Sequence, residues 1–233
     1  MAASRIPVRQ WSGTAFWSNR DAVLDACMHD GSNLRHACEQ LRADREIVLA
    51  AVKHDGQALR WASANLQADR SLVLAAVKQE GQALFSADVD LRDDHALVLA
   101  AVKQNAMALR YASQRLRANS WLVWQAVWRE GVALEFASDE LRACRAMVST
   151  AVTCNGRALE HAAAHLRDDR EIVLEAVTIY GRALAYASLR LRADYDVVVA
   201  AITQEPIAMY WASVELRADL ADEYDEIVAE FGL

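Results

Sequence analysis

Apolar residues recur along this sequence with a fixed period of 25 residues. The clearest example is a column of eight leucines, each 25 residues after the one before: Leu41, Leu66, Leu91, Leu116, Leu141, Leu166, Leu191 and Leu216. A fixed repeat of this length is typical of a unit that cannot bury its apolar face alone and stacks on copies of itself. The pattern therefore predicts an array of stacked repeats.

The first half of each repeat predicts an amphipathic helix. In one copy, Val48, Ala51 and Val52 follow the i, i+3, i+4 spacing of a single helical face. Asp44 precedes them and is a favourable N-cap residue, because its carboxylate can accept hydrogen bonds from the free N–H groups of the first turn. We expect Gly56 to end this helix with the positive φ that glycine adopts easily.

The second half of each repeat predicts a shorter helix. It is expected over residues 57–65, with Ala58, Leu59 and Ala62 facing inward and Leu66 closing it. Alanine fills the position of Ala62 in all eight copies. Small residues at a fixed place let neighbouring helices approach closely, so stacking is expected to stabilise helices that are marginal alone.

The periodicity therefore predicts an all-α fold, an α-solenoid of eight 25-residue helix-turn-helix repeats over residues 19–218. Residues 1–18 are expected to form a leader that covers the open end of the first repeat. Three aromatic residues are assigned to this cover: Trp11, Phe16 and Trp17. The period then fails, and an amphipathic pattern predicts a C-terminal capping helix over residues 219–233.

Three copies depart from the repeat pattern. Ala106 stands in the glycine column, so we expect either a left-handed Asn105 or a strained turn. Pro206 stands in the same column and pushes Glu205 out of the helical region, so this copy is expected to turn differently. Cys144 replaces the aspartate or asparagine of the cap column.

Composition and charge narrow the class of partner. The net charge is −7 and the pI is about 5.4. A protein that neutralises many phosphates is normally basic, so general nucleic-acid binding is disfavoured. No stretch approaches 18 consecutive apolar residues, so we expect no transmembrane helix and no membrane insertion.

The four cysteines show no spacing typical of a metal site or a redox motif. They are Cys27, Cys38, Cys144 and Cys154. We interpret them as buried, reduced thiols. This interpretation fits an intracellular, reducing compartment, with the cytoplasm favoured.

The repeat pattern resembles the short repeats grouped as domain of unknown function 4116. One copy carries every position of that pattern: Ala176, Val177, Gly181, Ala183, Leu184, Tyr186, Ala187, Ser188, Leu191, Arg192 and Asp194. The resemblance covers about residues 19–219. It implies an all-helical repeat fold and brings no known activity, substrate or catalytic residue.

The most unusual residues on the predicted surface are three tryptophans of the fifth copy. Trp121, Trp124 and Trp128 lie on one stripe of the predicted helix, where other copies carry different residues, such as Lys53 in the column of Trp128. In one interpretation the indoles cover small residues of the next copy: Ala146, Ser149, Thr150 and Thr153. In the other they line a groove that receives a partner, since tryptophan is enriched at interaction hot spots. For Trp128 we favour the partner contact.

Met107 and Val132 extend this candidate surface. They share one column in adjacent copies and could form a continuous apolar strip. The candidate partner-binding residues are therefore Trp121, Trp124, Trp128, Met107 and Val132.

Two further columns have structural interpretations beside functional ones. An aromatic column (His36, Trp61, Ser86, Tyr111, Phe136, His161, Tyr186 and Trp211) is assigned to packing between repeats, with a ladder for stacking RNA bases as the alternative. An arginine column (Arg42, Gln67, Arg92, Arg117, Arg142, Arg167, Arg192 and Arg217) is assigned to helix C-terminal carbonyls or Asp caps, with phosphate or acidic peptide as the alternative.

The sequence carries no motif of a catalytic or metal site. His161 and His165 share one helical face but lack a third ligand, and no nucleophile elbow or phosphate-binding glycine loop occurs. We expect no cofactor and no metal. The hypothesis is a noncatalytic helical-repeat protein that binds protein, as an adaptor, a scaffold or a subunit of a larger assembly. The alternatives are nucleic-acid recognition through the arginine or aromatic column, and an enzyme whose site spans several repeats.

Overall fold

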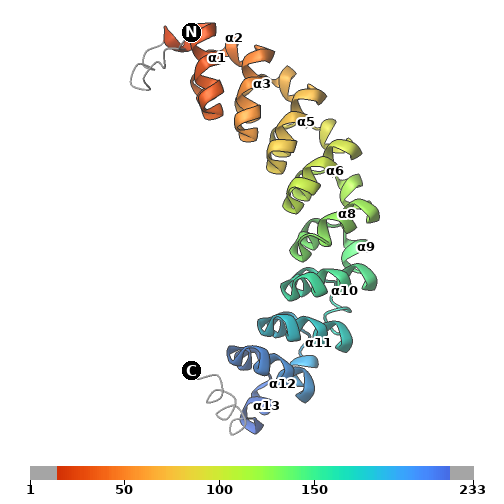
Figure 1. Cartoon of the computed structure of the whole chain (residues 1–233). Helices are drawn as coiled ribbons and strands as arrows, with labels where there is room; N and C mark the ends of the chain where they lie inside the picture. The colour runs from red at the N-terminus through yellow and green to blue at the C-terminus, as the bar shows by residue number, and fades with distance from the viewer. Residues whose placement is uncertain (1–14, 221–233) are drawn as a thin grey trace. The chain divides into compact units, whose positions relative to one another are not determined.

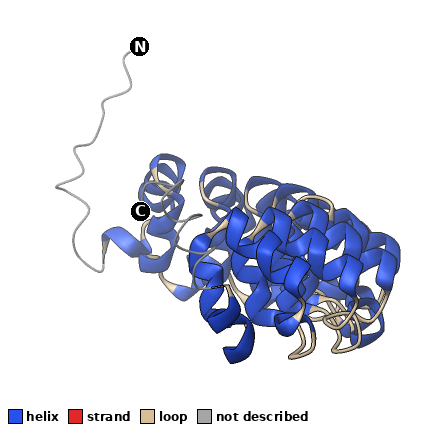
Figure 2. Ribbon diagram, turned by 90° about the horizontal axis from the view of Figure 1, so that it is seen from below, coloured by secondary structure: helices blue, strands red, loops and turns tan. Residues whose placement is uncertain are grey.

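The computed structural model describes residues 15–220, and every regular element in that range is a helix. Contacts divide the chain into two compact units, Met1–Ser113 and Gln114–Leu233, which we call the N-terminal unit and the C-terminal unit. Figure 2 shows helices joined by short loops within the part that is described. The all-helical fold with tandem repeats that the sequence predicts is confirmed.

Both units repeat one order of elements: an α-helix of eight to ten residues, a six-residue 3-10 helix and a short helical turn. The N-terminal unit contains η2 (Phe16–Ser18), α1 (Arg20–His29), η3 (Gly31–His36), α2 (Glu39–Arg42), α3 (Arg45–His54), η4 (Gly56–Trp61), α4 (Ala64–Gln67), α5 (Arg70–Gln79), η5 (Gly81–Ser86), η6 (Leu91–Asp93), α6 (His95–Gln104) and η7 (Ala106–Tyr111).

The C-terminal unit follows the same order. It contains α7 (Gln114–Arg117), α8 (Ser120–Val127), η8 (Gly131–Phe136), α9 (Asp139–Arg142), α10 (Arg145–Cys154), η9 (Gly156–His161), α11 (Arg170–Ile179), η10 (Gly181–Tyr186), η11 (Leu191–Ala193), α12 (Tyr195–Gln204), η12 (Pro206–Trp211) and α13 (Val214–Asp219). Within each unit the long α-helices pack side by side, and the six-residue 3-10 helices form a second layer beside them (Figure 1).

The core lies between these two layers. Val48, Ala51 and Val52 of α3 are fully buried, as are Ala58 and Leu59 of η4, and the equivalent positions of other copies are buried too. The first helix begins where the sequence predicts, because its cap residue accepts backbone hydrogen bonds in nearly every copy. These residues are Asn19, Asp44, Asp69, Asp94, Asn119, Asp169 and Asp194. Cys144 makes no side-chain cap hydrogen bond.

The prediction of a second helix over residues 57–65 is wrong. The chain forms a 3-10 helix that ends at Trp61, passes through extended Ala62 and Ser63, and starts a new turn at Ala64. The break is tertiary in origin, because the extended Ser63 donates its N–H to the Arg42 carbonyl of the preceding copy at 2.9 Å. The same bond joins equivalent residues of both units: Asp88 to Gln67, Ser113 to Arg92, Ser138 to Arg117, Ala163 to Arg142, Ser188 to Arg167 and Ser213 to Arg192.

The predicted role of the glycine column is also wrong. Gly56 has no left-handed backbone, and the helix before it ends instead at an extended Asp55 with φ −139°. Glycine fits at this position because the next copy approaches closely: a Cβ atom at Gly56 would lie 2.6 Å from the Ala76 carbonyl oxygen. The column therefore marks inter-repeat contact rather than a special turn.

The two departures in this column leave the backbone unchanged. Asn105 before Ala106 has φ −148°, and Glu205 before Pro206 has φ −146°, so both are extended like Asp55. The prediction of a left-handed Asn105 is wrong, and so is the prediction that the Pro206 copy turns differently. Proline fits because it favours an extended residue before it and supplies the φ of a first helical position.

The described part of the leader packs on the first copy. The Trp17 ring lies 4.9 Å from the His36 ring, and the Trp17 carbonyl accepts a 3.0 Å hydrogen bond from Cys38 N–H. Trp11 lies outside the described residues. The predicted capping helix over residues 219–233 also lies outside them, except for Asp219, which ends α13, and the buried Leu220.

Candidate functional site

Trp121 and Trp124 of α8 and its C-cap residue Trp128 lie on the solvent side of the long-helix layer. The side of α8 that carries Leu122, Val123, Ala126 and Val127 is buried in the core. On the other side, Trp121 is 51% exposed, Trp128 is 68% exposed, and Trp124 between them is half-buried. We call these three residues the tryptophan stripe.

The small residues of α10 form a polar network beside this stripe. Ser149 donates from Oγ to Glu175 Oε2 at 3.1 Å, and Thr153 donates from Oγ1 to Glu175 Oε1 at 2.5 Å. These hydroxyls therefore bond to α11, the helix on the far side from α8. Packing of the Trp124 ring on Ser149 stays a prediction.

Met107 and Val132 are both half-buried. Met107 lies in η7 of the N-terminal unit, where its N–H donates to Asn105 Oδ1 at 2.9 Å. Val132 lies in η8 of the C-terminal unit. Because the two residues belong to different units, the continuous apolar strip stays a prediction.

Carbonyl binding, one of the roles expected for the arginine column, occurs at two of its positions. Arg192 donates from Nε to the Ala187 carbonyl at 3.1 Å and from Nη2 to the Ala185 carbonyl. Gln67, the exception in this column, directs its amide at the Ala62 carbonyl at 3.2 Å. At these two positions the donors serve the preceding 3-10 helix.

The members of the aromatic column are mostly half-buried and contact neighbouring side chains. Tyr111 lies 5.3 Å from the Phe85 ring, and the guanidinium of Arg110 lies 5.3 Å from its ring centroid. Arg60 lies over Trp61 in the same way, at 5.4 Å. These contacts fit the interpretation as packing between and within copies.

A second arginine column, which sequence reasoning missed, interlocks successive copies. It occupies the first helical position and reaches the Asp cap of the next copy: Arg20 to Asp44, Arg45 to Asp69, Arg70 to Asp94, Arg145 to Asp169 and Arg170 to Asp194. The 24-residue offset between partners was the available signal. At these five positions the Asp caps therefore bind this column, and not the column of Arg192, for which Asp caps were one of two expected targets.

The ion pairs between successive copies lower the pKa values of the cap aspartates. The hydrogen bond from Arg70 lowers the pKa of Asp94 below its ordinary value, and bonds from the backbone act in the same direction against partial burial. For Asp69, the hydrogen bond from Ser71 lowers the pKa most, with a further contribution from Arg45. Both carboxylates therefore stay ionised to lower pH than free aspartate.

Sequence reasoning also missed an apolar face on the N-terminal unit. A row of half-buried leucines runs across its four long helices, next to a row of exposed lysines; together they form the leucine–lysine face, made of Leu24, Leu49, Leu74, Leu99, Lys53, Lys78 and Lys103. The signal was present, because these three lysines are the only lysines of the sequence.

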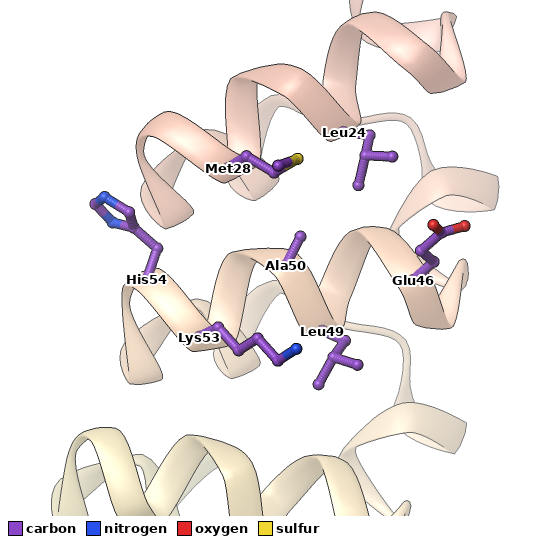
Figure 3. A pocket seen from close by; sticks show the side chains of 7 residues that line it. All are labelled: Leu24, Met28, Glu46, Leu49, Ala50, Lys53 and His54. Atoms are coloured by element: carbon purple, nitrogen blue, oxygen red, sulfur yellow. The ribbon is translucent and has the colours of Figure 1, made fainter.

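A groove between α1 and α3 lies at one end of this face, with a cavity volume of about 540 Å³. Leu24 and Met28 line it from α1, and Leu49, Ala50 and Lys53 line it from α3 (Figure 3). Met28 is 62% exposed. The groove is therefore open to solvent and apolar along most of its length.

Comparison with known families identifies the repeats. The family described as Domain of unknown function (DUF4116) matches three segments, residues 19–67, 69–117 and 169–217. The chain belongs to the DUF4116 family. Comparison with curated proteins gave no significant match, and neither did comparison with solved structures.

Each DUF4116 match spans two of the 25-residue periods, so the family pattern covers a pair of copies. Residues 118–168 lie outside the three matched segments. That stretch contains the tryptophan stripe and Cys144, the cap residue without a side-chain hydrogen bond. The tryptophan stripe and Cys144 of this DUF4116 chain therefore lie outside the segments that match the family.

The cysteines of this DUF4116 chain are free, but the expectation that they are buried is only partly right. Cys27 is buried, and burial raises the pKa of its thiol to about 12. Cys38 is half-buried, whereas Cys144 and Cys154 are exposed. Across residues 15–220, no cluster of three or more metal-ligating side chains occurs. No helix in that range is long and apolar enough to cross a bilayer.

Proposed function

We propose that this chain is an α-solenoid of eight 25-residue repeats that binds protein partners and catalyses no reaction. It would act as an adaptor, a scaffold or a subunit of a larger assembly. The observation that carries the proposal is the exposure of the tryptophan stripe, with Trp121 of α8 51% exposed and Trp128, the C-cap residue of α8, 68% exposed. Tryptophan is the residue type most enriched at the energetic centres of protein interfaces.

The geometry of the stripe favours binding over packing. Trp121, Trp124 and Trp128 follow an i, i+3, i+7 spacing, so their side chains lie along one line of the helix surface. Covering the exposed indoles of Trp121 and Trp128 removes a large apolar area from water, and the Trp128 ring carries an N–H that can donate to a partner. This combination suits a contact that is apolar at its centre and polar at its edge.

The surroundings supply that polar edge. The network of Ser149, Thr153 and Glu175 lies on the neighbouring helices α10 and α11 of the same layer. Interfaces between proteins commonly surround an aromatic centre with a rim of hydrogen-bonding groups. We therefore assign the tryptophan stripe as the centre of a protein-binding surface and this network as part of its rim.

The test compares two exposed aromatic residues of the C-terminal unit. A partner captured by the full chain is identified by mass spectrometry, produced separately and titrated by calorimetry against the wild type, Trp128→Ala and Tyr210→Ala. Tyr210 is a matched control, because it is 73% exposed but lies in the 3-10 layer. We expect Trp128→Ala to weaken binding by roughly 30-fold or more, the range of an interface hot spot, and Tyr210→Ala to leave it unchanged.

The melting temperature separates the two interpretations of Trp128. The proposal requires that Trp128→Ala melts within a few degrees of the wild type while binding falls. If the variant instead loses stability heavily and keeps its partner affinity, Trp128 belongs to the core and the proposal is wrong.

A further inference from the structure

We infer that the leucine–lysine face of the N-terminal unit binds an acidic amphipathic helix of a partner protein. This assignment rests on the protein-binding function proposed above and adds a second surface with a partner of defined chemistry. Two rows of side chains carry it: an apolar row that needs an apolar partner surface, and a cationic row that needs carboxylates.

The apolar row is continuous within the unit. Leu24, Leu49, Leu74 and Leu99 occupy equivalent positions on α1, α3, α5 and α6, and each is half-buried. These helices pack consecutively, α1 on α3, α3 on α5 and α5 on α6, so the leucines form neighbours in a row. In α3, α5 and α6 an alanine follows the leucine, so the side chain next to each of these leucines is small. A partner can therefore lay apolar side chains across several helices at once.

The cationic row runs beside it. Lys53, Lys78 and Lys103 lie four residues after successive leucines, about one helical turn away, and all three are exposed. None of them takes part in an ion pair among residues 15–220. The lysine row is thus available to a partner.

The arginines of the same helices differ from the lysines in this respect. Arg45 is held by Asp69 at 2.9 Å, and Arg70 is held by Asp94 at 2.6 Å. Their charges are balanced within the repeat array. In a chain with a net charge of −7, three unbalanced cations in one row select for an acidic ligand.

Acidic residues are scarce along this part of the surface. Helices α5 and α6 contain no aspartate or glutamate, and Glu46 of α3 is paired with Arg20 at 2.5 Å. Asp21 and Asp25 on α1 are the other acidic residues of the four helices, and they lie at the end that has Met28 in place of lysine. The cationic character therefore increases from α1 toward α6.

The spacing of the rows suggests how a helix would fit. Helices packed side by side lie about 8–10 Å apart, so successive lysines are separated by roughly that distance. Seven residues of an α-helix span about 10 Å and return to nearly the same face. Carboxylates at i, i+7 and i+14 on a partner helix would therefore meet the three lysines, with its apolar stripe over the leucines.

A peptide pair tests the inference with the full-length chain. The probe is a fluorescent, capped 21-residue helical peptide of Leu, Ala and Glu, with leucines on one face and glutamates along its edge. The control peptide carries Lys in place of Glu. By fluorescence anisotropy at 50 mM NaCl, we expect the Glu peptide to bind at least tenfold more tightly than the Lys peptide, with affinity falling as salt rises.

A matched pair of triple variants locates the binding. Lys53→Gln with Lys78→Gln and Lys103→Gln should lower the affinity for the Glu peptide about tenfold, as expected for three exposed charge pairs. Arg35→Gln with Arg60→Gln and Arg110→Gln removes three charges from exposed positions in the 3-10 layer of the same unit and should leave the affinity unchanged.

Three outcomes would overturn the inference: equal affinity for the two peptides, unchanged binding by the lysine triple variant, or a dimer of the chain that this variant abolishes while neither peptide binds. The last would assign the face to a second copy. None of these outcomes affects partner capture through Trp128, so failure here and failure of the proposed function are distinguishable.

Discussion

Arg70 donates from Nε to the Asp94 carboxylate at 2.6 Å, and that same carboxylate caps the helix that follows it. Asp94 thus forms an ion pair with the preceding copy and caps the first helix of its own copy. The other Asp oxygen accepts from Leu97 N–H at 3.0 Å. Because one side chain serves both purposes, the repeat couples the start of each first helix to its stacking on the copy before.

Substitution at Asp94 separates these two roles. Asp94→Ala removes both, and we expect the free energy of unfolding to fall by about 1–2 kcal/mol. Asp94→Asn should cost less than about 1 kcal/mol, because Asn119 caps α8 in the same column by accepting from Leu122 N–H at 2.9 Å. Urea denaturation measures both values. Equal losses for the two variants would show that the charge, and not the cap, dominates.

The same carboxylates predict acid sensitivity. Asp69 and Asp94 have folded-state pKa values below that of unfolded aspartate. Their stabilisation is therefore fully present above the unfolded value of about 3.9 and is lost as the pH falls through the folded values. We expect urea midpoints to be level near neutral pH and to fall steeply below about pH 4. Asp94→Asn should reduce the steepness of that fall, and a pH profile identical to that of the wild type would contradict this account.

Because successive copies approach closely at the glycine column, adding one methyl group there should lower the stability of the fold. A Cβ atom at Gly81 would lie 2.5 Å from the Ala101 carbonyl oxygen of the next copy. Since the obstacle is backbone, Gly81→Ala should lower the free energy of unfolding by about 1–3 kcal/mol. The neighbouring exposed Gln82 supplies the control, and Gln82→Ala should change it by less than about 0.5 kcal/mol. A neutral Gly81→Ala would mean that the copies can separate slightly without cost.

Burial predicts which cysteine reacts. The Cys27 thiol is buried and its pKa is raised to about 12, whereas Cys144 is exposed. Because the thiolate is the reactive form, iodoacetamide at pH 8 should label Cys144 rapidly and leave Cys27 unmodified. Mass spectrometry after timed quenching measures this, with labelling of all four cysteines in 8 M urea as the reference. Comparable rates at Cys27 and Cys144 in the native protein would contradict the burial of Cys27.

The candidate surfaces differ in how far the sequence could reveal them. Two members of the tryptophan stripe were predictable, because Trp121 and Trp128 are large residues in columns that carry glutamate or lysine in other copies. The lysines of the leucine–lysine face were visible in the sequence, but its leucines were not, because within the N-terminal unit Leu49 and its equivalents are as regular as the core position Val48. Only the packing of the copies leaves Leu49 half-buried while Val48 is completely covered.

The sequence by itself determined the local features of this protein: the 25-residue period, the first helix of each copy and its Asp44-type cap. These depend on residues within one or two turns of each other, so spacing and residue type suffice. The tertiary structure alone decided the second half of the repeat. There the Ser63 N–H bonds to the Arg42 carbonyl of the previous copy, and Gly56 makes room for the Ala76 carbonyl of the next. Such contacts join residues about 20 positions apart, and they exist only once the copies are stacked.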